Sequence, residues 1–203
     1  MQKHYTYLAL GDSYTIGESV ELQNSFPYQT VQLLRKQGFE FTAPEIIAKT
    51  GWTAEELDNA VSHYSFSPKY DFVTLLTGVN NQYRGQDIIL YKEQFETLLK
   101  KALDLAGGKK EHLFILSIPD YSTTPFARSK EVDKISKEID EYNKLNKALS
   151  IQYKIPYIDI NESTAAAKDP ESLVAEDGLH PSAKAYGKWA KKLAEAFAKL
   201  VKK

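Results

Sequence analysis

Cysteine is absent from this sequence of 203 residues. Its absence excludes disulfide bonds, a thiolate nucleophile and metal sites built on cysteine. It does not fix the compartment in which the protein works, because secreted proteins can also lack cysteine.

Long apolar runs and an excess of one charge are also missing. No stretch approaches the roughly 20 apolar residues of a membrane-spanning helix, and the short run before Gly11 has neither the length nor the cleavage site of a signal peptide. The net charge is −1, so no broad field favours nucleic acid or an anionic membrane as a partner. As written, the sequence predicts a cytoplasmic protein that is not an integral membrane protein and binds no nucleic acid. A secreted or periplasmic location stays open if a signal peptide has been removed.

The residues that are present fit one globular domain. Apolar residues make up 42% of the chain and charged residues 26%, which is ordinary for soluble proteins. No internal repeat or low-complexity tract interrupts the chain, and its length suits a single domain over 1–203. Nothing in the sequence indicates an oligomeric state.

Short apolar runs alternate with longer segments of helical periodicity. The predicted strands are Tyr5–Leu10, Phe39–Ala48 (interrupted by Pro44), Phe72–Thr77, His112–Ile118 and Pro156–Ile160. The predicted helices cover 25–37, 53–62, 86–106, 130–152 and 182–201. Several strands are continuous apolar runs, which is typical of strands covered on both faces. The alternation predicts a parallel sheet with helices on both sides.

Polar groups suited to chemistry follow the predicted strands. In parallel α/β sheets, ligands bind beyond the carboxyl ends of the strands. Ser13 follows the first strand, Gly51 the second and Asn80 the third, and a loop carrying Asp177 and His180 follows the fifth. We therefore expect these five residues to meet at one edge of the sheet.

These residue types suit acyl transfer. A serine hydroxyl needs a base to remove its proton, and the usual base is a histidine oriented by a carboxylate. His180 is the one histidine in a loop that can return to this edge, and Asp177 precedes it by three residues. Negative charge on the reacting oxygen needs preorganised donors. Asn80 offers an amide, Gly51 an unobstructed N–H, and Ser13 its own N–H at the start of a helix.

Each of these residues has an ordinary structural interpretation when it is taken alone. Gly-Asp-Ser is a common turn or helix cap, Asp177-Gly178 is a good turn, and Asn80 fits a plain loop. Their joint occurrence after successive strands, in the order that one reaction needs, favours catalysis.

Four sequence blocks carry a resemblance to a known family. They read "LGDSYTIGE" with Ser13, "AKTGWTAEEL" with Gly51, "LLTGVNNQYRG" with Asn80, and "EDGLHPS" with Asp177 and His180. In content, order and spacing they resemble the SGNH (GDSL-type) serine hydrolases, and they extend over nearly the whole chain.

The resemblance implies a fold, a site and a reaction. The fold is a three-layer α/β/α sandwich around a five-stranded parallel sheet of flavodoxin-like topology. The site is a Ser13–His180–Asp177 triad, with Ser13 N–H, Gly51 N–H and the Asn80 side chain as the oxyanion hole. The reaction is ester hydrolysis through an acyl-serine intermediate, with no metal and no organic cofactor.

The blocks depart from the family pattern at two positions. Tyr14 stands where leucine is usual, at a position that varies in the family. Asn81 stands where the family usually has aspartate, which leaves open how the loop holds Asn80. Asp12 is expected to be structural, accepting hydrogen bonds from neighbouring amides.

The substrate is less well defined than the reaction. The residues expected to contact substrate flank the blocks or the loop after the fourth strand: Tyr14, Trp52, Tyr83 and Tyr121, with Arg84 and Phe126 nearby. The 119–129 segment is a candidate lid. We expect a small-molecule ester with a short acyl group, on a sugar, a lipid or an aryl alcohol. A lysophospholipase or thioesterase of the same family is an alternative, and a non-catalytic carbohydrate- or lipid-binding protein is an alternative of another class.

Other enzyme classes fit poorly. The loop after the first strand has acidic residues and no lysine, which disfavours a phosphate site. The G-x-S-x-G elbow of α/β-hydrolases fails because Thr15 replaces the second glycine. No H-E-x-x-H cluster suggests a zinc hydrolase.

Overall fold

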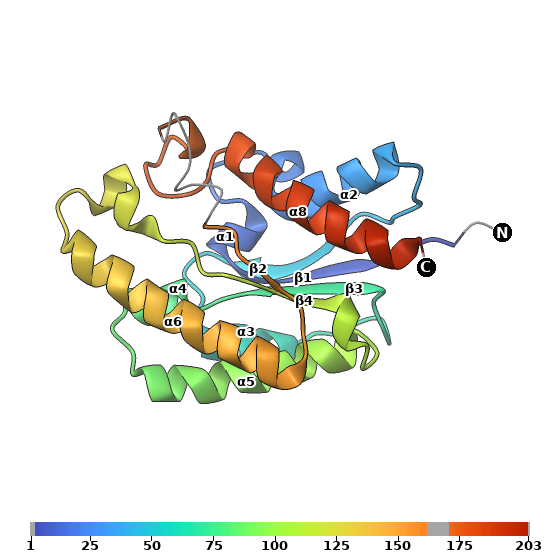
Figure 1. The fold of residues 1–203 in the computed structure, drawn as a ribbon, viewed down its shortest axis with the longest axis horizontal. Helices are drawn as coiled ribbons and strands as arrows, with labels where there is room; N and C mark the ends of the chain where they lie inside the picture. The colour runs from blue at the N-terminus through green and yellow to red at the C-terminus, as the bar shows by residue number, and fades with distance from the viewer. Residues whose placement is uncertain (1–2, 162–170, 203) are drawn as a thin grey trace.

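A parallel sheet of five strands forms the centre of the molecule. The computed structural model describes residues 3–161 and 171–202. The strands lie in the order β2-β1-β3-β4-β5, and each neighbouring pair is parallel (Figure 1). Their bounds are β1 Tyr7–Asp12, β2 Glu45–Lys49, β3 Phe72–Leu76, β4 Leu113–Leu116 and β5 Tyr157–Ile158. The predicted parallel sheet is therefore confirmed.

Helices cover both faces of the sheet, which confirms the three-layer sandwich. On one face α2 packs against α8, and on the other α5 packs against both α3 and α6 (Figure 1). The long helices are α2 Phe26–Lys36, α3 Ala54–His63, α5 Ile88–Leu105, α6 Val132–Tyr153 and α8 Ala183–Val201. Short 3-10 turns occupy Leu22–Asn24, Lys110–His112, Tyr121–Thr123, Pro125–Ala127 and Glu171–Leu173. In the described ranges, no helix combines the length and the apolarity that crossing a membrane requires.

The predicted strands and the observed ones differ most at β1 and β2. The second strand starts at Glu45, directly after Pro44, because proline cannot donate to a ladder. Before it, Tyr5 and Phe41 form only an isolated bridge. The first strand runs two residues further than predicted, since Gly11 and Asp12 still pair with β2. The strand thus ends immediately before Ser13.

Helix α8 fixes the position of the loop that precedes it. Tyr186, Ala190, Leu193 and Phe197 form its apolar stripe, and all four are fully buried. Burying a large apolar side chain contributes about 1.5–3 kcal/mol. Ser182 begins the helix as its N-cap, and His180 lies two residues before that cap. The packing of α8 therefore anchors the histidine loop.

Two short helices follow strands and have too few residues for a periodic pattern. Helix α1, Ser13–Ile16, follows β1 directly, and helix α4, Val79–Tyr83, follows β3 after Gly78. The expectation that Ser13 begins a helix is confirmed. Both helices start at the carboxyl edge of the sheet, where they present the residues of the candidate site.

Candidate active site

Ser13 lies where β1 turns directly into α1. The turn depends on Gly11, because a Cβ at that position would lie 2.0 Å from Thr15 Oγ1 and 2.6 Å from the Leu76 carbonyl oxygen. No side chain fits there without moving the first turn of α1 or the neighbouring strand. The glycine of Gly-Asp-Ser therefore allows the close approach that carries Ser13 to the edge of the sheet.

Asp12 is the N-cap of α1. Its Oδ1 accepts a hydrogen bond from Tyr14 N at 3.0 Å, as predicted for a structural residue. The side chain is fully buried, and Oδ2 has no hydrogen-bond partner among the described residues. Burial raises the pKa of Asp12 from 3.8 to about 7, although hydrogen bonds from backbone amides oppose the rise.

The raised pKa of Asp12 makes stability depend on pH. The folded state holds the Asp12 proton more tightly than the unfolded chain does. Protonated Asp12 therefore adds to the free energy of unfolding, fully below about pH 4, and this addition is lost as the pH rises to about 7. Asp12→Asn keeps an oxygen acceptor for Tyr14 N and has no charge. We expect the free energy of unfolding of the wild type to fall over this range, by at most about 1.4 kcal/mol per pH unit, relative to that of Asp12→Asn. Urea unfolding at several pH values measures both slopes, and parallel slopes would contradict the prediction.

His180 bridges Ser13 and Asp177. Its Nε2 lies 2.9 Å from Ser13 Oγ, and its Nδ1 lies 2.5 Å from Asp177 Oδ2. Both Ser13 and His180 are buried. The structure thus brings together the three residues that the sequence assigned to a triad.

The loop geometry explains the spacing between Asp177 and His180. Asp177 Oδ1 accepts hydrogen bonds from the backbone N–H groups of Leu179 and His180, each at 2.9 Å. This local turn folds the carboxylate back over the imidazole, so that Oδ2 faces Nδ1. Because an ionised carboxylate only accepts, Nδ1 carries the proton and the Nε2 lone pair faces Ser13.

Asp177 is ionised in the folded protein at neutral pH. Burial acts to raise its pKa, but hydrogen bonds from His180, Leu179 N and Ser19 Oγ outweigh this and lower the pKa to about 2. The two carboxylates of the site thus have opposite shifts. The pKa of Asp12 is raised and that of Asp177 is lowered, and Asp177 is the carboxylate in contact with His180.

Ser19 is a partner of Asp177 that the sequence did not reveal. Its Oγ donates to Asp177 Oδ2 at 2.7 Å, the same oxygen that faces His180. Ser19 has a left-handed backbone, with φ of 63°, which is uncommon for a residue other than glycine. In a sequence, an exposed loop serine that hydrogen-bonds a carboxylate looks the same as one that contacts only solvent, so this role could not be predicted.

Gly51 lies in a tight turn at the end of β2. Trp52 N donates to the Lys49 carbonyl at 3.2 Å, which places Gly51 third in the turn with φ of +83°. A type II turn requires positive φ at this position, and its central peptide takes no part in the turn's own hydrogen bond. The Gly51 N–H makes no hydrogen bond to any residue in 3–161 or 171–202. It is therefore available to a ligand.

Asn80 lies in the first turn of α4. Its Nδ2 donates to the Trp52 carbonyl at 3.0 Å, which uses one of its two amide hydrogens. The strand leads into α4 through Gly78, where φ is +124° and a Cβ would lie 2.5 Å from the Tyr91 hydroxyl. The second amide hydrogen of Asn80 has no partner within the described residues, and Asn80 lines the cavity beside Ser13.

Asn81 holds α4 against the start of α3. Its Oδ1 accepts from Ala54 N at 2.9 Å, and its Nδ2 donates to Gln86 Oε1 at 2.8 Å and to Gln94 Oε1 at 3.2 Å. The side chain is fully buried. An aspartate at this position could still accept from Ala54 N. Its other carboxylate oxygen, however, would face Gln86 Oε1 and Gln94 Oε1, which are also acceptors. The departure from the family pattern therefore has a structural explanation, because the amide network of Asn81 holds the helix that carries Asn80.

A cavity of about 140 Å³ opens beside Ser13. Its lining residues are Ser13, Tyr14, Val79, Asn80, Tyr83, Tyr121, Phe126, Leu179 and His180. Three of the four residues expected to contact substrate, Tyr14, Tyr83 and Tyr121, therefore border the cavity. Trp52 does not line it, and its side chain packs against the hydrophobic core. Its backbone carbonyl instead orients Asn80.

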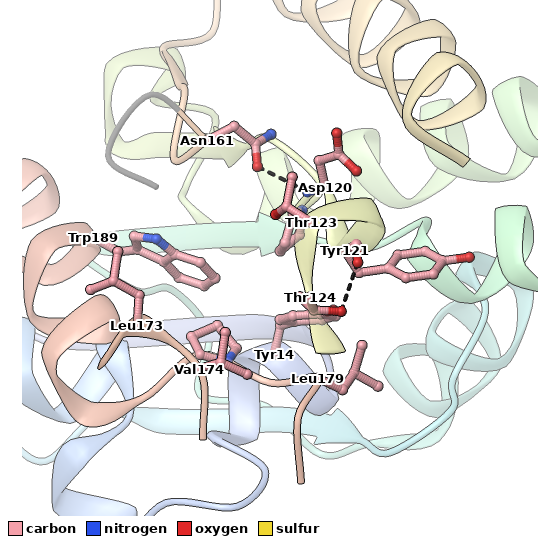
Figure 2. A pocket seen from close by; sticks show the side chains of 12 residues that line it. Tyr14, Asp120, Tyr121, Thr123, Thr124, Asn161, Leu173, Val174, Leu179 and Trp189 are labelled. Carbon is pink, nitrogen blue, oxygen red and sulfur yellow. Dashed lines mark hydrogen bonds between the residues drawn. The ribbon is translucent and has the colours of Figure 1, made fainter. Parts of the chain in front are cut away.

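Figure 2 shows a second, smaller cavity of about 60 Å³. Tyr14, Tyr121 and Leu179 line both cavities. On the far side, Trp189 of α8 and Asn161 are among its lining residues (Figure 2). The two cavities therefore adjoin at these three side chains.

The 119–129 segment forms one side of both cavities. It contains two 3-10 turns, Tyr121–Thr123 and Pro125–Ala127. The Tyr121 hydroxyl donates to Gln82 Oε1 at 2.9 Å, and Phe126 N donates to the Gly178 carbonyl at 2.9 Å. The segment is thus tied to α4 and to the histidine loop, and its movement as a lid stays a prediction.

Comparisons with known proteins concern the family and the fold of the chain. A family model described as the GDSL-like Lipase/Acylhydrolase family matches residues 9–188. No curated protein matches the chain by sequence.

Three solved structures illustrate the similarity of fold. A lipase/acylhydrolase from Enterococcus faecalis is 19% identical, with a TM-score of 0.77 over 98% of this chain and 97% of that one. Axe2, an acetylxylan esterase from Geobacillus stearothermophilus, is 18% identical, with a TM-score of 0.73 over 95% and 94%. The psychrotrophic esterase EstA from Pseudoalteromonas sp. is 16% identical, with a TM-score of 0.69 over 98% and 100%.

Proposed function

Because the chain belongs to the GDSL-like lipase/acylhydrolase family and is an ester-hydrolysing enzyme, we propose that it cleaves short-chain acyl esters with Ser13 as the nucleophile. The observation that carries the proposal is the pair of contacts made by His180, 2.9 Å to Ser13 Oγ and 2.5 Å to Asp177. This is the arrangement in which a base activates a serine and a carboxylate orients the base.

The reaction proceeds in two halves. Ser13 Oγ attacks the ester carbonyl carbon while His180 Nε2 takes its proton, and Asp177 balances the charge of the imidazolium. The tetrahedral intermediate expels the alcohol, which takes the proton from His180. A water molecule then attacks the acyl-serine, again with His180 as base, and releases the carboxylic acid and free Ser13.

Donors from three strand ends stabilise the negative oxygen of each tetrahedral intermediate. They are the N–H groups of Ser13 and Gly51 and the second amide hydrogen of Asn80. Ser13 N–H lies in the first turn of α1, where helix amides have no intrahelical partner. Gly51 N–H is unbonded within the described residues. Since these donors are fixed before the substrate arrives, little reorganisation opposes charge development.

The size of the cavity supports a short acyl group. Its volume of about 140 Å³ is close to that of an engineered apolar cavity that binds benzene, about 150 Å³. An acyl chain of up to about six carbons fits such a space. Acetylated sugars are suitable candidates, and one of the structural neighbours is an acetylxylan esterase.

A fluorophosphonate probe and a series of p-nitrophenyl esters test the proposal. We expect the probe to label Ser13, and acetate and butyrate esters to be hydrolysed faster than decanoate and longer ones. Acetylated xylan, a lysophospholipid and an acyl thioester in the same assay identify the alcohol or thiol group. Absence of labelling, where a control serine esterase is labelled, contradicts the nucleophile. Rates that rise with chain length contradict the short acyl group.

Asn80→Ala is expected to lower kcat by about 10²- to 10³-fold, the usual effect of losing one oxyanion donor, with little change in KM. The loss appears in kcat because the donor acts mainly on the charge that develops in the transition state. Steady-state kinetics with p-nitrophenyl acetate measure both constants. Asn59→Ala, at an exposed position of α3, is the control and should keep wild-type values. A rise in KM alone for Asn80→Ala would assign Asn80 to ground-state binding.

A further inference from the structure

Arg84 reaches across from the end of α4 to the loop after β2. Its Nη2 donates to the Gly51 carbonyl at 2.5 Å, and its Nη1 lies 3.2 Å from Glu56 Oε2. The same Glu56 oxygen accepts from Thr53 N at 2.8 Å, as part of the capping box that begins α3. The guanidinium thus joins the carbonyl of the turn glycine to the first turn of the next helix.

Two successive carbonyls of this loop are bound by residues of one short segment. The Gly51 carbonyl accepts a hydrogen bond from Arg84, and the Trp52 carbonyl accepts one from Asn80. Asn80 precedes Arg84 by four residues in the sequence. Glycine has the largest backbone freedom of any residue, so the direction of its N–H depends on what holds the loop. Here the loop is held by the same segment that carries the Asn80 amide.

We propose that Arg84 is a positioning residue for the oxyanion hole. By binding the Gly51 carbonyl, it fixes the Gly51 N–H relative to the Asn80 amide, so that both donors meet one oxygen. The inference rests on the proposed function of Gly51 and Asn80. Because the guanidinium already binds the Gly51 carbonyl and Glu56, we do not assign Arg84 to binding a carboxylate or phosphate of the substrate.

Arg84→Ala is expected to lower kcat for p-nitrophenyl acetate by about 10- to 100-fold, the cost of misplacing a catalytic group by up to about 1 Å. KM should change by less than about twofold, because the oxyanion forms only after binding. The affinity for an alkyl boronic acid, which forms a tetrahedral adduct with the serine, should fall by a similar factor to kcat. Inhibition by the product carboxylate should not change. Added guanidinium at millimolar concentration should restore part of the lost kcat.

Glu56→Gln is the matched control. Glutamine at this position still suits a capping box, and the Arg84–Gly51 hydrogen bond is kept while the ion pair is lost. We expect this variant to keep kcat within about twofold, as an exposed ion pair contributes little. An equal loss of kcat in Glu56→Gln would show that Arg84 acts through the helix cap, and would overturn the proposal.

The remaining outcomes also decide the question. Wild-type kcat in Arg84→Ala, or a raised KM with kcat unchanged, overturns the positioning role. If circular dichroism shows that Arg84→Ala does not fold, Arg84→Gln is measured with the same readouts and the same criteria. A wild-type protein that hydrolyses no ester contradicts the proposed function itself, which separates that failure from a failure of the role of Arg84.

Discussion

Replacing Ser13 with alanine is expected to lower kcat for p-nitrophenyl acetate by about 10⁴- to 10⁶-fold, the range seen when the nucleophile of a serine hydrolase is removed. Without Oγ no acyl-enzyme forms, and only the oxyanion donors and substrate binding remain. The fold should survive, because the change removes one oxygen atom whose hydrogen-bond partner, His180, stays held by Asp177. Circular dichroism and the melting temperature check this, alongside the kinetics.

Ser65→Ala is the control for Ser13→Ala. Ser65 is exposed and follows α3, so its loss should change neither rate nor stability measurably. The fluorophosphonate should label wild-type protein and Ser65→Ala equally, and Ser13→Ala not at all. Near-normal turnover by Ser13→Ala would contradict the proposed mechanism as a whole.

Replacing His180 with alanine is expected to lower kcat by about as much as Ser13→Ala, roughly 10⁴- to 10⁶-fold. The serine is still present, but at neutral pH its hydroxyl has no base to remove the proton. Because the base and the nucleophile act as one unit, the double variant Ser13→Ala/His180→Ala should be no slower than either single variant. Steady-state kinetics on the three proteins test this non-additivity.

The control for His180→Ala is His63→Ala. His63 is an exposed residue at the end of α3, and its Nδ1 lies within hydrogen-bond distance of the Asn59 carbonyl. It should keep wild-type activity. Losses that add up in the double variant would show that Ser13 and His180 act independently, which the contact between them does not allow.

The sheet and the long helices could be predicted because their signals are summed over many residues. The apolar stripe of α8 repeats over four positions, and β3 and β4 are buried throughout and apolar apart from Thr74. Tertiary packing agrees with the local pattern in these elements, so each side chain adds to the same prediction. The meeting of Ser13 with Asp177 and His180 followed from the same sheet, since its strand ends share one edge.

What the sequence did not predict depends on single contacts. Helix α4, and the extent of helix α1 beyond its expected start at Ser13, have no periodic signal, because the two helices have only five and four residues. The bond from Ser19 to Asp177 needs a left-handed backbone that serine does not signal. Trp52 was expected at the cavity because it follows Gly51, but the backbone turn at Gly51 brings the Trp52 carbonyl, and not its ring, to Asn80.

The contact between Ser13 and His180 joins positions 167 residues apart in the chain. Ser13 is therefore translated 167 residues before its base, and the histidine loop directly precedes α8, which packs onto α2. Closing so long a loop costs conformational entropy, and contacts of large sequence separation slow folding. A nascent or partly folded chain therefore carries an unactivated serine that cannot attack cellular esters. Esterase activity then reports that folding is complete, which makes it a convenient readout for refolding experiments.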